Sequence, residues 1–441
     1  MTSPTRALEA ELVWTGAEFE EGIRISLTAA GRIAAVEPVD QATPASAALR
    51  VERLPGIALL PGFVDAHSHA FQRGLRGRGE SFPAGAGSFW TWREAMYALV
   101  DALDPTTLRR LSARAFNEMR DAGITTVGEF HYVHHHREGD FALDEAIVAA
   151  AADAGIRMVL LYSFYATGAP GRPLAGGQRR FATPSVDQFW RQLDRVAQHL
   201  DPAVHTAGVA PHSIRAAGPQ EIGEIYREAR RRAMPVHLHV EEQRREIEES
   251  LAAYGRTPMA VVLDATGDAP FTAVHCTHTS PEDMKRFLAA GGTVCACPLT
   301  EGNLGDGIPS LAQAHRVGHR LALGTDSNNR LAMLEEMRWL EYGQRLAGEL
   351  RGSLSDPGGD VAPTLLAAAT SGGADALGVP AGRLAPGLWA DAVAIDLTAP
   401  PLAEVPRQEL LAALVFGAGN EVVAGTYVGG LWRPSSRTSG T

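Results

Sequence analysis

The sequence predicts an α/β protein: a (β/α)₈ TIM barrel with a small β-sandwich formed by the N- and C-terminal segments. Short runs rich in apolar and β-branched residues alternate with helical runs through the middle of the chain, which is typical of βα units around a parallel sheet. About eight such runs are present, enough to close a barrel: 58–66, 124–130, 157–162, 204–210, 235–240, 271–275, 293–297 and 320–326. Histidines and carboxylates gather directly after these runs, where barrel enzymes carry their sites.

Capping residues mark the boundaries of helices between the runs. Asp104 followed by Pro105 predicts a helix start, and Gly123 predicts its end just before the next run. Ser280 and Pro281 open another helix in the same way. These boundaries support a strict alternation of strands and helices.

The two ends of the chain differ from this middle. Residues 7–54 alternate in short strand-like pieces with turn signals, and the same style returns between Gly387 and Val428. We therefore expect three segments. Residues 1–58 and 386–441 form the two parts of the β-sandwich, and residues 59–385 form the barrel.

Charge and composition argue against several classes of partner. With 441 residues and a formal net charge of -11, the chain lacks the basic surface that nucleic acids or anionic membranes attract. No apolar run approaches the roughly 18 residues of a membrane span, and acidic residues interrupt the start of the chain, where a signal peptide would be apolar. We expect a cytoplasmic protein that acts on a small molecule, with Cys276, Cys295 and Cys297 reduced.

Two histidines, His67 and His69, leave the first run at positions i and i+2, so both rings point to one face of the strand. Alone the pair is a weak signal, because solvated loop histidines give the same pattern. His239 and Asp326 end two further runs, and three neutral imidazoles with one carboxylate suit a zinc-like ion. Such a set leaves one position for a water, whose pKa a catalytic zinc lowers to about 7. His237 shares a face with His239 and is the alternative ligand.

Two more residues at strand ends suggest proton transfer beside the ion. Glu242 lies just beyond His239, where its carboxylate can reach a bound group and act as a general acid. The alternative is a solvated glutamate at the head of an acidic helix. His275 can orient or deprotonate the water, and His278 is its rival at the same strand end.

Four runs in this order resemble the amidohydrolase superfamily: PGFVDAHSH at 61–69, HLHVEE at 237–242, VHCTH at 274–278 and LGTDSN at 323–328. The segment 382–391 is similar to the family's return from the barrel to its terminal β layer. The resemblance implies a barrel of the amidohydrolase type. Binuclear members bridge two metals with a carboxylated lysine after the fourth strand, whereas the only lysine here, Lys285, follows the sixth run. The resemblance therefore implies one divalent metal, and Zn²⁺ is the expected ion.

Four further segments resemble the branch of this family that hydrolyses N-formimino-L-glutamate; they lie at 69–73, 89–94, 129–134 and 211–215. This resemblance implies deamination to N-formyl-L-glutamate and ammonia in histidine degradation. The substrate carries two carboxylates, which guanidinium groups bind bidentately. The expected substrate-binding residues are Gln72, Arg93, Tyr132, His212 and Arg215.

The implied reaction gives catalytic roles to three residues. His275 helps to deprotonate the water, Glu242 protonates the imine nitrogen, and Asp326 passes a proton to the departing amine. The same chemistry would suit a deaminase of a cyclic amidine such as guanine, and a non-catalytic binding protein on a decayed barrel is a further alternative. The resemblance also implies a homodimer. The stretch 297–303 lies near the predicted mouth and receives no role.

Overall fold

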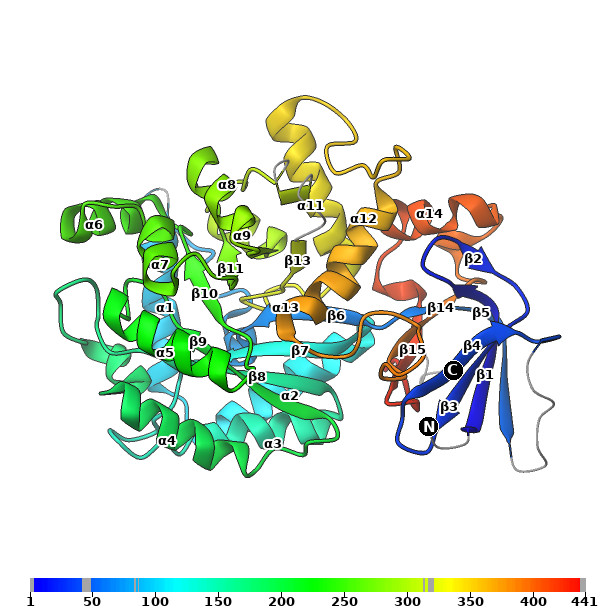
Figure 1. Cartoon of the computed structure of the whole chain (residues 1–441), viewed down its shortest axis with the longest axis horizontal. Helices are drawn as coiled ribbons and strands as arrows, with labels where there is room; N and C mark the ends of the chain where they lie inside the picture. The colour runs from blue at the N-terminus through cyan, green and yellow to red at the C-terminus, as the bar shows by residue number, and fades with distance from the viewer. Residues whose placement is uncertain are drawn as a thin grey trace.

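The computed structural model describes residues 4–41, 49–82, 85, 87–311, 314–315 and 321–436. A barrel of parallel strands covered by helices forms one part of the molecule (Figure 1). A sheet built from both terminal segments lies beside it. This arrangement confirms the predicted fold class.

The barrel consists of two four-stranded parallel sheets within the described residues. Their strands are β6 (Phe63–Ser68), β7 (Ile124–His131), β8 (Arg157–Phe164) and β9 (His205–Pro211), then β10 (His237–Val240), β11 (Thr272–His275), β12 (Thr293–Ala296) and β13 (Leu321–Leu323). Two isolated parallel bridges, between Ser68 and Asp326 and between Val209 and Val236, join the sheets and close the ring. The carboxyl ends of all these strands therefore meet at one mouth.

The prediction that the run 58–66 forms one strand is wrong, because the run forms parts of two strands. The run 58–66 is divided at Gly62, because β5 (Arg50–Pro61) belongs to the terminal sheet and β6 starts the barrel. A Cβ at Gly62 would lie 2.2 Å from Oγ1 of Thr125, so a side chain has no room where the chain passes between the two sheets. The other predicted runs match barrel strands, although Arg320, the first residue of the last run, lies outside the described residues.

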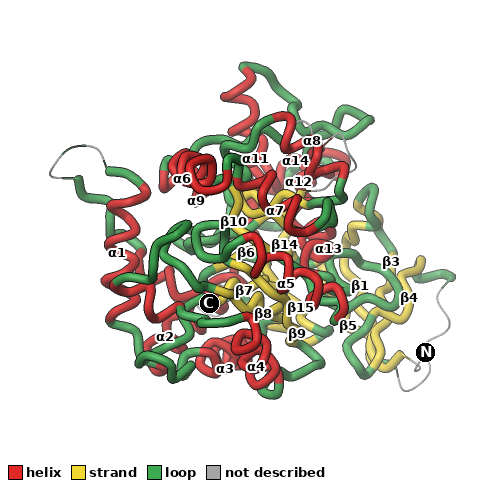
Figure 2. The backbone as a smooth tube through the Cα atoms, turned by 60° about the vertical axis from the view of Figure 1, so that its left-hand side comes forward, coloured by secondary structure: helices red, strands yellow, loops and turns green. Residues whose placement is uncertain are grey.

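Helices cover the outside of the barrel (Figure 2). Asp104 caps α2 by accepting a hydrogen bond from the backbone N–H of Thr107, and Ser280 caps α8 by accepting one from Asp283, so both predicted helix starts are confirmed. The described α-helices are α1 (Phe89–Asp101), α2 (Pro105–Asp121), α3 (Asp144–Ala154), α4 (Val186–Ala197), α5 (Pro219–Arg231), α6 (Arg244–Tyr254), α7 (Pro258–Thr266), α8 (Pro281–Ala289), α9 (Pro298–Leu304), α11 (Met333–Gly348), α12 (Ala362–Ala367), α13 (Gly373–Leu377) and α14 (Leu410–Gly417).

The terminal sheet has the strand order β16-β15-β14-β5-β1-β3-β4, with β2 paired to β1. Its remaining strands are β1 (Pro4–Trp14), β2 (Phe19–Glu20), β3 (Ile23–Thr28), β4 (Ile33–Pro38), β14 (Ala392–Asp396), β15 (Val423–Val428) and β16 (Leu431–Pro434). Arg157 of β8 donates to Asp391 at 2.7 Å, a buried ion pair that ties the barrel to this sheet. Both terminal segments thus share one layer, while the predicted boundaries at 58 and 386 stay a prediction.

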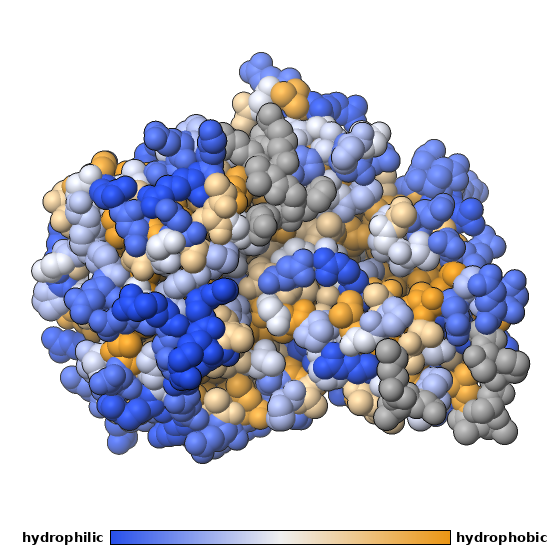
Figure 3. Space-filling view, in the orientation of Figure 1, coloured by the Kyte–Doolittle hydropathy of each residue, from blue (hydrophilic) through white to orange (hydrophobic). Residues whose placement is uncertain are grey.

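Hydrophilic side chains cover much of the face shown in Figure 3, with hydrophobic ones interspersed. Among the described residues, no helix combines the length and the apolar character needed to cross a membrane. Cys276, Cys295 and Cys297 are unpaired and buried.

Candidate active site

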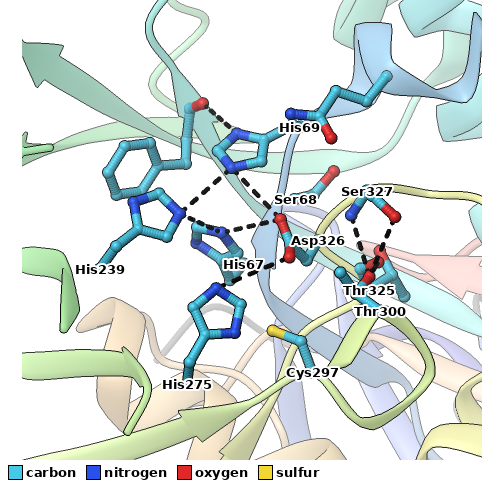
Figure 4. Close-up of polar contacts among 12 residues, drawn as sticks. His67, Ser68, His69, His239, His275, Cys297, Thr300, Thr325, Asp326 and Ser327 are labelled. Atoms are coloured by element: carbon cyan, nitrogen blue, oxygen red, sulfur yellow. Dashed lines mark hydrogen bonds and ion pairs between the residues drawn. The ribbon is translucent and has the colours of Figure 1, made fainter. Parts of the chain in front are cut away.

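Four side chains from the ends of β6, β10 and β13 converge at the mouth of the barrel (Figure 4). Nε2 of His239 lies 3.2 Å from Nε2 of His67 and 3.4 Å from Nε2 of His69. Oδ1 of Asp326 lies 3.4 Å from Nε2 of His67 and 3.3 Å from Nε2 of His69. The two histidines of the i, i+2 pair therefore share a centre with a third histidine and a carboxylate that are distant in the sequence.

These separations fit a tetrahedral metal ion. Ligand atoms at about 2.1 Å from a tetrahedral Zn²⁺ lie about 3.4 Å from one another. Three imidazole nitrogens and one carboxylate oxygen are also the donors that a borderline divalent cation prefers. The donor set thus fits one divalent ion held by His67, His69, His239 and Asp326. Their assignment as its ligands remains a prediction.

Hydrogen bonds and burial prepare the rings to act as neutral ligands. Nδ1 of His69 donates to the carbonyl of Phe130 at 2.8 Å, and Nδ1 of His239 donates to the carbonyl of His212 at 3.1 Å. Each bond leaves the Nε2 lone pair free to face the centre. Burial lowers the pKa of His67 to about 3 and also lowers the pKa values of His69 and His239. The pKa of Asp326 falls below its ordinary value, because the nearby histidines outweigh the effect of burial.

Two buried carboxyl groups fix the backbone around the histidine pair. Asp65 accepts hydrogen bonds from the backbone N–H of His67 at 3.3 Å and of Thr325 at 3.0 Å, which links the ends of β6 and β13. Glu129 on β7 accepts from the backbone N–H of Ala70 at 2.9 Å. Burial raises the pKa of Asp65 to about 7 and that of Glu129 to about 8. These groups hold the ligand-bearing segments in register.

His275 lies beside the centre and faces three carboxylates. Its Nε2 is 3.8 Å from Oδ2 of Asp326 and 3.9 Å from Oε1 of Glu242. Its Nδ1 is 3.4 Å from Oε1 of Glu301. Burial disfavours the charged ring, but Glu242, Glu301 and Asp326 outweigh it and raise the pKa of His275 to about 10. These carboxylates favour the protonated ring, which can hold a water through an N–H donor. The predicted role of His275 in deprotonating that water stays a prediction.

The two rival histidines lie elsewhere. Nε2 of His237 donates to the carbonyl of Ala376 at 2.9 Å, which turns this ring away from the mouth. His278 is half-buried and is absent from the groups of described residues that could share an ion. The geometry therefore favours His239 and His275 at their strand ends.

A pocket opens over this centre, and all five predicted substrate-binding residues line it. They are Gln72, Arg93, Tyr132, His212 and Arg215. Gln72 donates to the hydroxyl of Tyr132 at 2.8 Å, and the Tyr132 ring packs edge-on against His69 with centroids 4.9 Å apart. Tyr132, one of the predicted substrate-binding residues, is therefore in direct contact with the candidate metal centre.

The two arginines of the pocket have different surroundings. Arg93 has no acidic partner among the described residues, and its guanidinium lies 5.4 Å from the ring centroid of Trp90 and 5.2 Å from that of Tyr97. Arg215 already pairs with an acid, because its Nη2 donates to Oε2 of Glu242 at 2.9 Å. A ligand carboxylate meets an unpaired cation at Arg93 and a paired one at Arg215.

The sequence reasoning missed several residues of the site. Aromatic and apolar side chains complete the pocket wall: Phe89, Trp92, Met96, Tyr97, Tyr165 and Phe181. Glu301, within the stretch 297–303 that received no role, contacts His275 and accepts from the backbone N–H of Cys297 at 2.9 Å. Tyr165 lies just after a predicted strand, which is the signal that could have found it. Phe89 and Trp92 lie in the segment 89–94 that carries the resemblance, but an apolar helical face is equally typical of a core, so the sequence does not predict their place in the pocket wall.

Residues 58–433 match the model of the amidohydrolase family, so the chain belongs to this family. Together with the donor set at the mouth, this membership makes the protein a metal-dependent hydrolase. The family expectation drawn from the sequence is confirmed.

More specific relatives share almost the whole chain. A formimidoylglutamate deiminase of Pseudomonas aeruginosa is 38% identical over 97% of this chain and 94% of its own. An amidohydrolase from Brucella melitensis superposes with a TM-score of 0.87 at 32% identity, covering 97% of this chain and 94% of that one. An adenosine deaminase from Xanthomonas campestris with bound zinc has a TM-score of 0.82 at 26% identity, covering 99% and 94%.

Proposed function

We propose that this protein hydrolyses N-formimino-L-glutamate to N-formyl-L-glutamate and ammonia, a step of histidine degradation. The observation that carries the proposal is the pocket in which Arg93 and Arg215 lie beside the candidate metal centre. The near full-length similarity to a formimidoylglutamate deiminase points to the same reaction. A pocket for guanine would have little use for two buried or half-buried guanidinium groups.

Recognition uses the pocket wall on the β6–β9 side. Guanidinium groups bind carboxylates through paired N–H donors, and the partly dehydrated pocket strengthens these bonds. Arg93, free of acidic partners in the described chain, is suited to take one substrate carboxylate. Arg215, Tyr132 and Gln72 surround the space for the other, and His212 lies between them and the centre.

Proton transfer uses Glu242, His275 and Asp326. When bound, the divalent ion, which we propose to be Zn²⁺, polarises the reacting groups and lowers the pKa of a water to about 7. Asp326 accepts the proton that the water releases, with the help of His275, whose ring orients the water. Glu242 gives a proton to the terminal nitrogen of the formimino group, and Asp326 returns the second proton to the same nitrogen. The hydroxyl group added from the water gives its remaining proton to Glu242 as the formyl carbonyl forms. A carbon–oxygen double bond thus replaces the carbon–nitrogen double bond, and ammonia leaves as a neutral molecule.

An ammonia-release assay with N-formimino-L-glutamate and guanine in parallel tests the proposal. We expect rapid release from the first substrate and release at the background level from guanine. Turnover of guanine with no activity on the formimino compound would overturn the assignment. Failure with every amidine tested would favour the non-catalytic alternative.

We further propose that the protein acts as a homodimer in the cytoplasm. The exposed large apolar residues Trp339 and Leu346 on α11, with Leu350 just beyond it, offer a surface for a second copy. The unpaired buried cysteines suit a reducing compartment. Light scattering should give the mass of two chains, and fractionation should place the activity with the cytosol. A single-chain mass would contradict the dimer.

A further inference from the structure

A buried glutamate behind Arg215 has no role in the reaction outlined above. Glu246, in the first turn of α6, is 1% exposed. Neither of its carboxylate oxygens has a hydrogen-bond partner within the described part of the chain. Its Oε2 lies 4.0 Å from Nε of Arg215, and the residue does not line the pocket.

Such a group is costly to the fold. A buried carboxyl group without hydrogen bonds destabilises the folded protein, and a glutamine or an apolar side chain would avoid much of this cost. Burial raises the pKa of Glu246 to about 7, while Arg215 opposes this shift. Burial and the charges of Glu242 and Glu241 disfavour the charge of this carboxylate, and Arg215 is the largest influence that favours it.

Arg215 therefore has two acidic neighbours on one guanidinium. Oε2 of Glu242, which lines the pocket, accepts a hydrogen bond from Nη2 of Arg215 at 2.9 Å. Oε2 of Glu246, which does not line the pocket, lies 4.0 Å from Nε of the same guanidinium. In the proposed reaction Glu242 must take up a proton and turn to the formimino nitrogen, and both changes remove a counter-charge from a buried cation. An ion pair that loses one partner in a buried site is strongly destabilised unless another charge replaces it.

We propose that Glu246 is a positioning residue that balances the charge of Arg215 while Glu242 serves the substrate. This inference rests on the proposed function. With Glu246 present, Arg215 holds Glu242 less tightly and stays in place as Glu242 moves. When Glu246 carries no charge, Arg215 binds Glu242 more strongly, which slows the chemical step. A substrate carboxylate then meets a less neutralised guanidinium and binds at least as well.

The test compares Glu246→Gln, Glu246→Asp and the control Glu248→Gln in the metal-loaded enzyme, at a pH above 7. Glu248 lies on the same helix and is exposed. We expect Glu246→Gln to lower kcat about tenfold or more without raising KM, since residues in one charge network couple strongly. Glu246→Asp should recover part of kcat, and Glu248→Gln should match the wild type. Unchanged kcat in Glu246→Gln, or a fall in kcat with a parallel rise in KM and loss of metal, would overturn the proposal.

Binding of L-glutamate, a dicarboxylate that cannot react, gives a readout independent of turnover. Calorimetry should show binding to Glu246→Gln that is equal to or several-fold tighter than binding to the wild type. Weaker binding, or no binding to either protein, contradicts the proposal. Absence of ammonia release from N-formimino-L-glutamate by the wild type would instead refute the proposed function, and the glutamate measurement would still decide the relation between Glu246 and Arg215.

Discussion

The two halves of the barrel contribute different chemistry to one pocket. The half formed by β6–β9 supplies an amide, aromatic rings and guanidinium groups, in Gln72, Tyr132, Tyr165, Arg93 and Arg215. The half formed by β10–β13 supplies the two carboxyl groups that line the pocket, those of Glu242 and Asp326. The buried carboxyl groups of Glu246, Glu301 and Asp306 belong to the same half but lie outside the pocket lining. Histidines from both halves meet at the candidate metal centre.

In the proposed reaction, recognition and proton transfer are therefore assigned to residues that are separated in space and in the sequence. The proposed substrate carries its basic formimino group on the α-nitrogen, next to one carboxylate, and its second carboxylate at the far end of the side chain. Carboxylates favour the guanidinium side, and the amidine favours the acidic side. Arg215 and Glu242 are in contact and join the two sides. We therefore expect a ligand carboxylate bound at Arg215 to change the surroundings of Glu242.

Removal of the metal should have the largest effect, because both halves depend on the centre between them. Dialysis against a chelator should abolish ammonia release, and added Zn²⁺ should restore it. Metal analysis before and after dialysis checks that the ion has left. Full activity of the metal-free protein would show that ammonia release does not depend on a bound ion.

Glu242→Gln should remove the proton donor of the acidic half while leaving recognition intact. We expect kcat to fall by about a hundredfold or more, the usual contribution of a general acid. The amide can still accept from Arg215, so the metal content and KM should change little. Wild-type turnover with the metal still bound would show that the acidic half does not supply this proton.

Arg93→Met should damage recognition more than chemistry. Loss of a charge-assisted hydrogen bond should lower kcat/KM about tenfold to a hundredfold, mostly through KM. Arg191→Met on the exposed face of α4 is the matched control and should leave both constants unchanged. A fall confined to kcat would assign Arg93 to the chemical step instead.

A smaller effect concerns the pH dependence of stability on the β7 side. Burial raises the pKa of Glu129 to about 8, above the value of about 4.3 in an unfolded chain. The folded protein therefore holds an extra proton between these values, and its contribution to stability is lost as the pH rises through about 8. The Glu129→Gln variant has no carboxyl proton to lose. Its free energy of unfolding should therefore fall less than that of the wild type between about pH 5 and 8, with a difference on the order of 1–3 kcal/mol. Denaturant unfolding at several pH values measures the difference, and parallel curves for both proteins would refute it.

Much of this arrangement could be predicted from local sequence. Helix caps such as Asp104 and Ser280 act within one turn, and the i, i+2 spacing of His67 and His69 sets their common face without knowledge of the fold. The positions of His239 and Asp326 at strand ends then suffice to bring them to the same mouth, because all barrel strands point the same way.

The rest depends on contacts between distant segments. The run 58–66 divides at Gly62, where a side chain would clash with Thr125, and the run itself does not reveal this close approach. Glu246 and Glu301 look like ordinary helical glutamates until the fold buries them beside Arg215 and His275. Their roles could not be predicted from the sequence, since burial and long-range partners decide them.

A crystal structure of the metal-loaded protein, with anomalous data at the zinc absorption edge, tests the proposed metal centre most directly. We predict one strong peak per chain, at about 2.0–2.2 Å from Nε2 of His67, His69 and His239 and from a carboxylate oxygen of Asp326. A peak at another site, or the absence of an ion shared by these four side chains, would contradict the proposed metal centre.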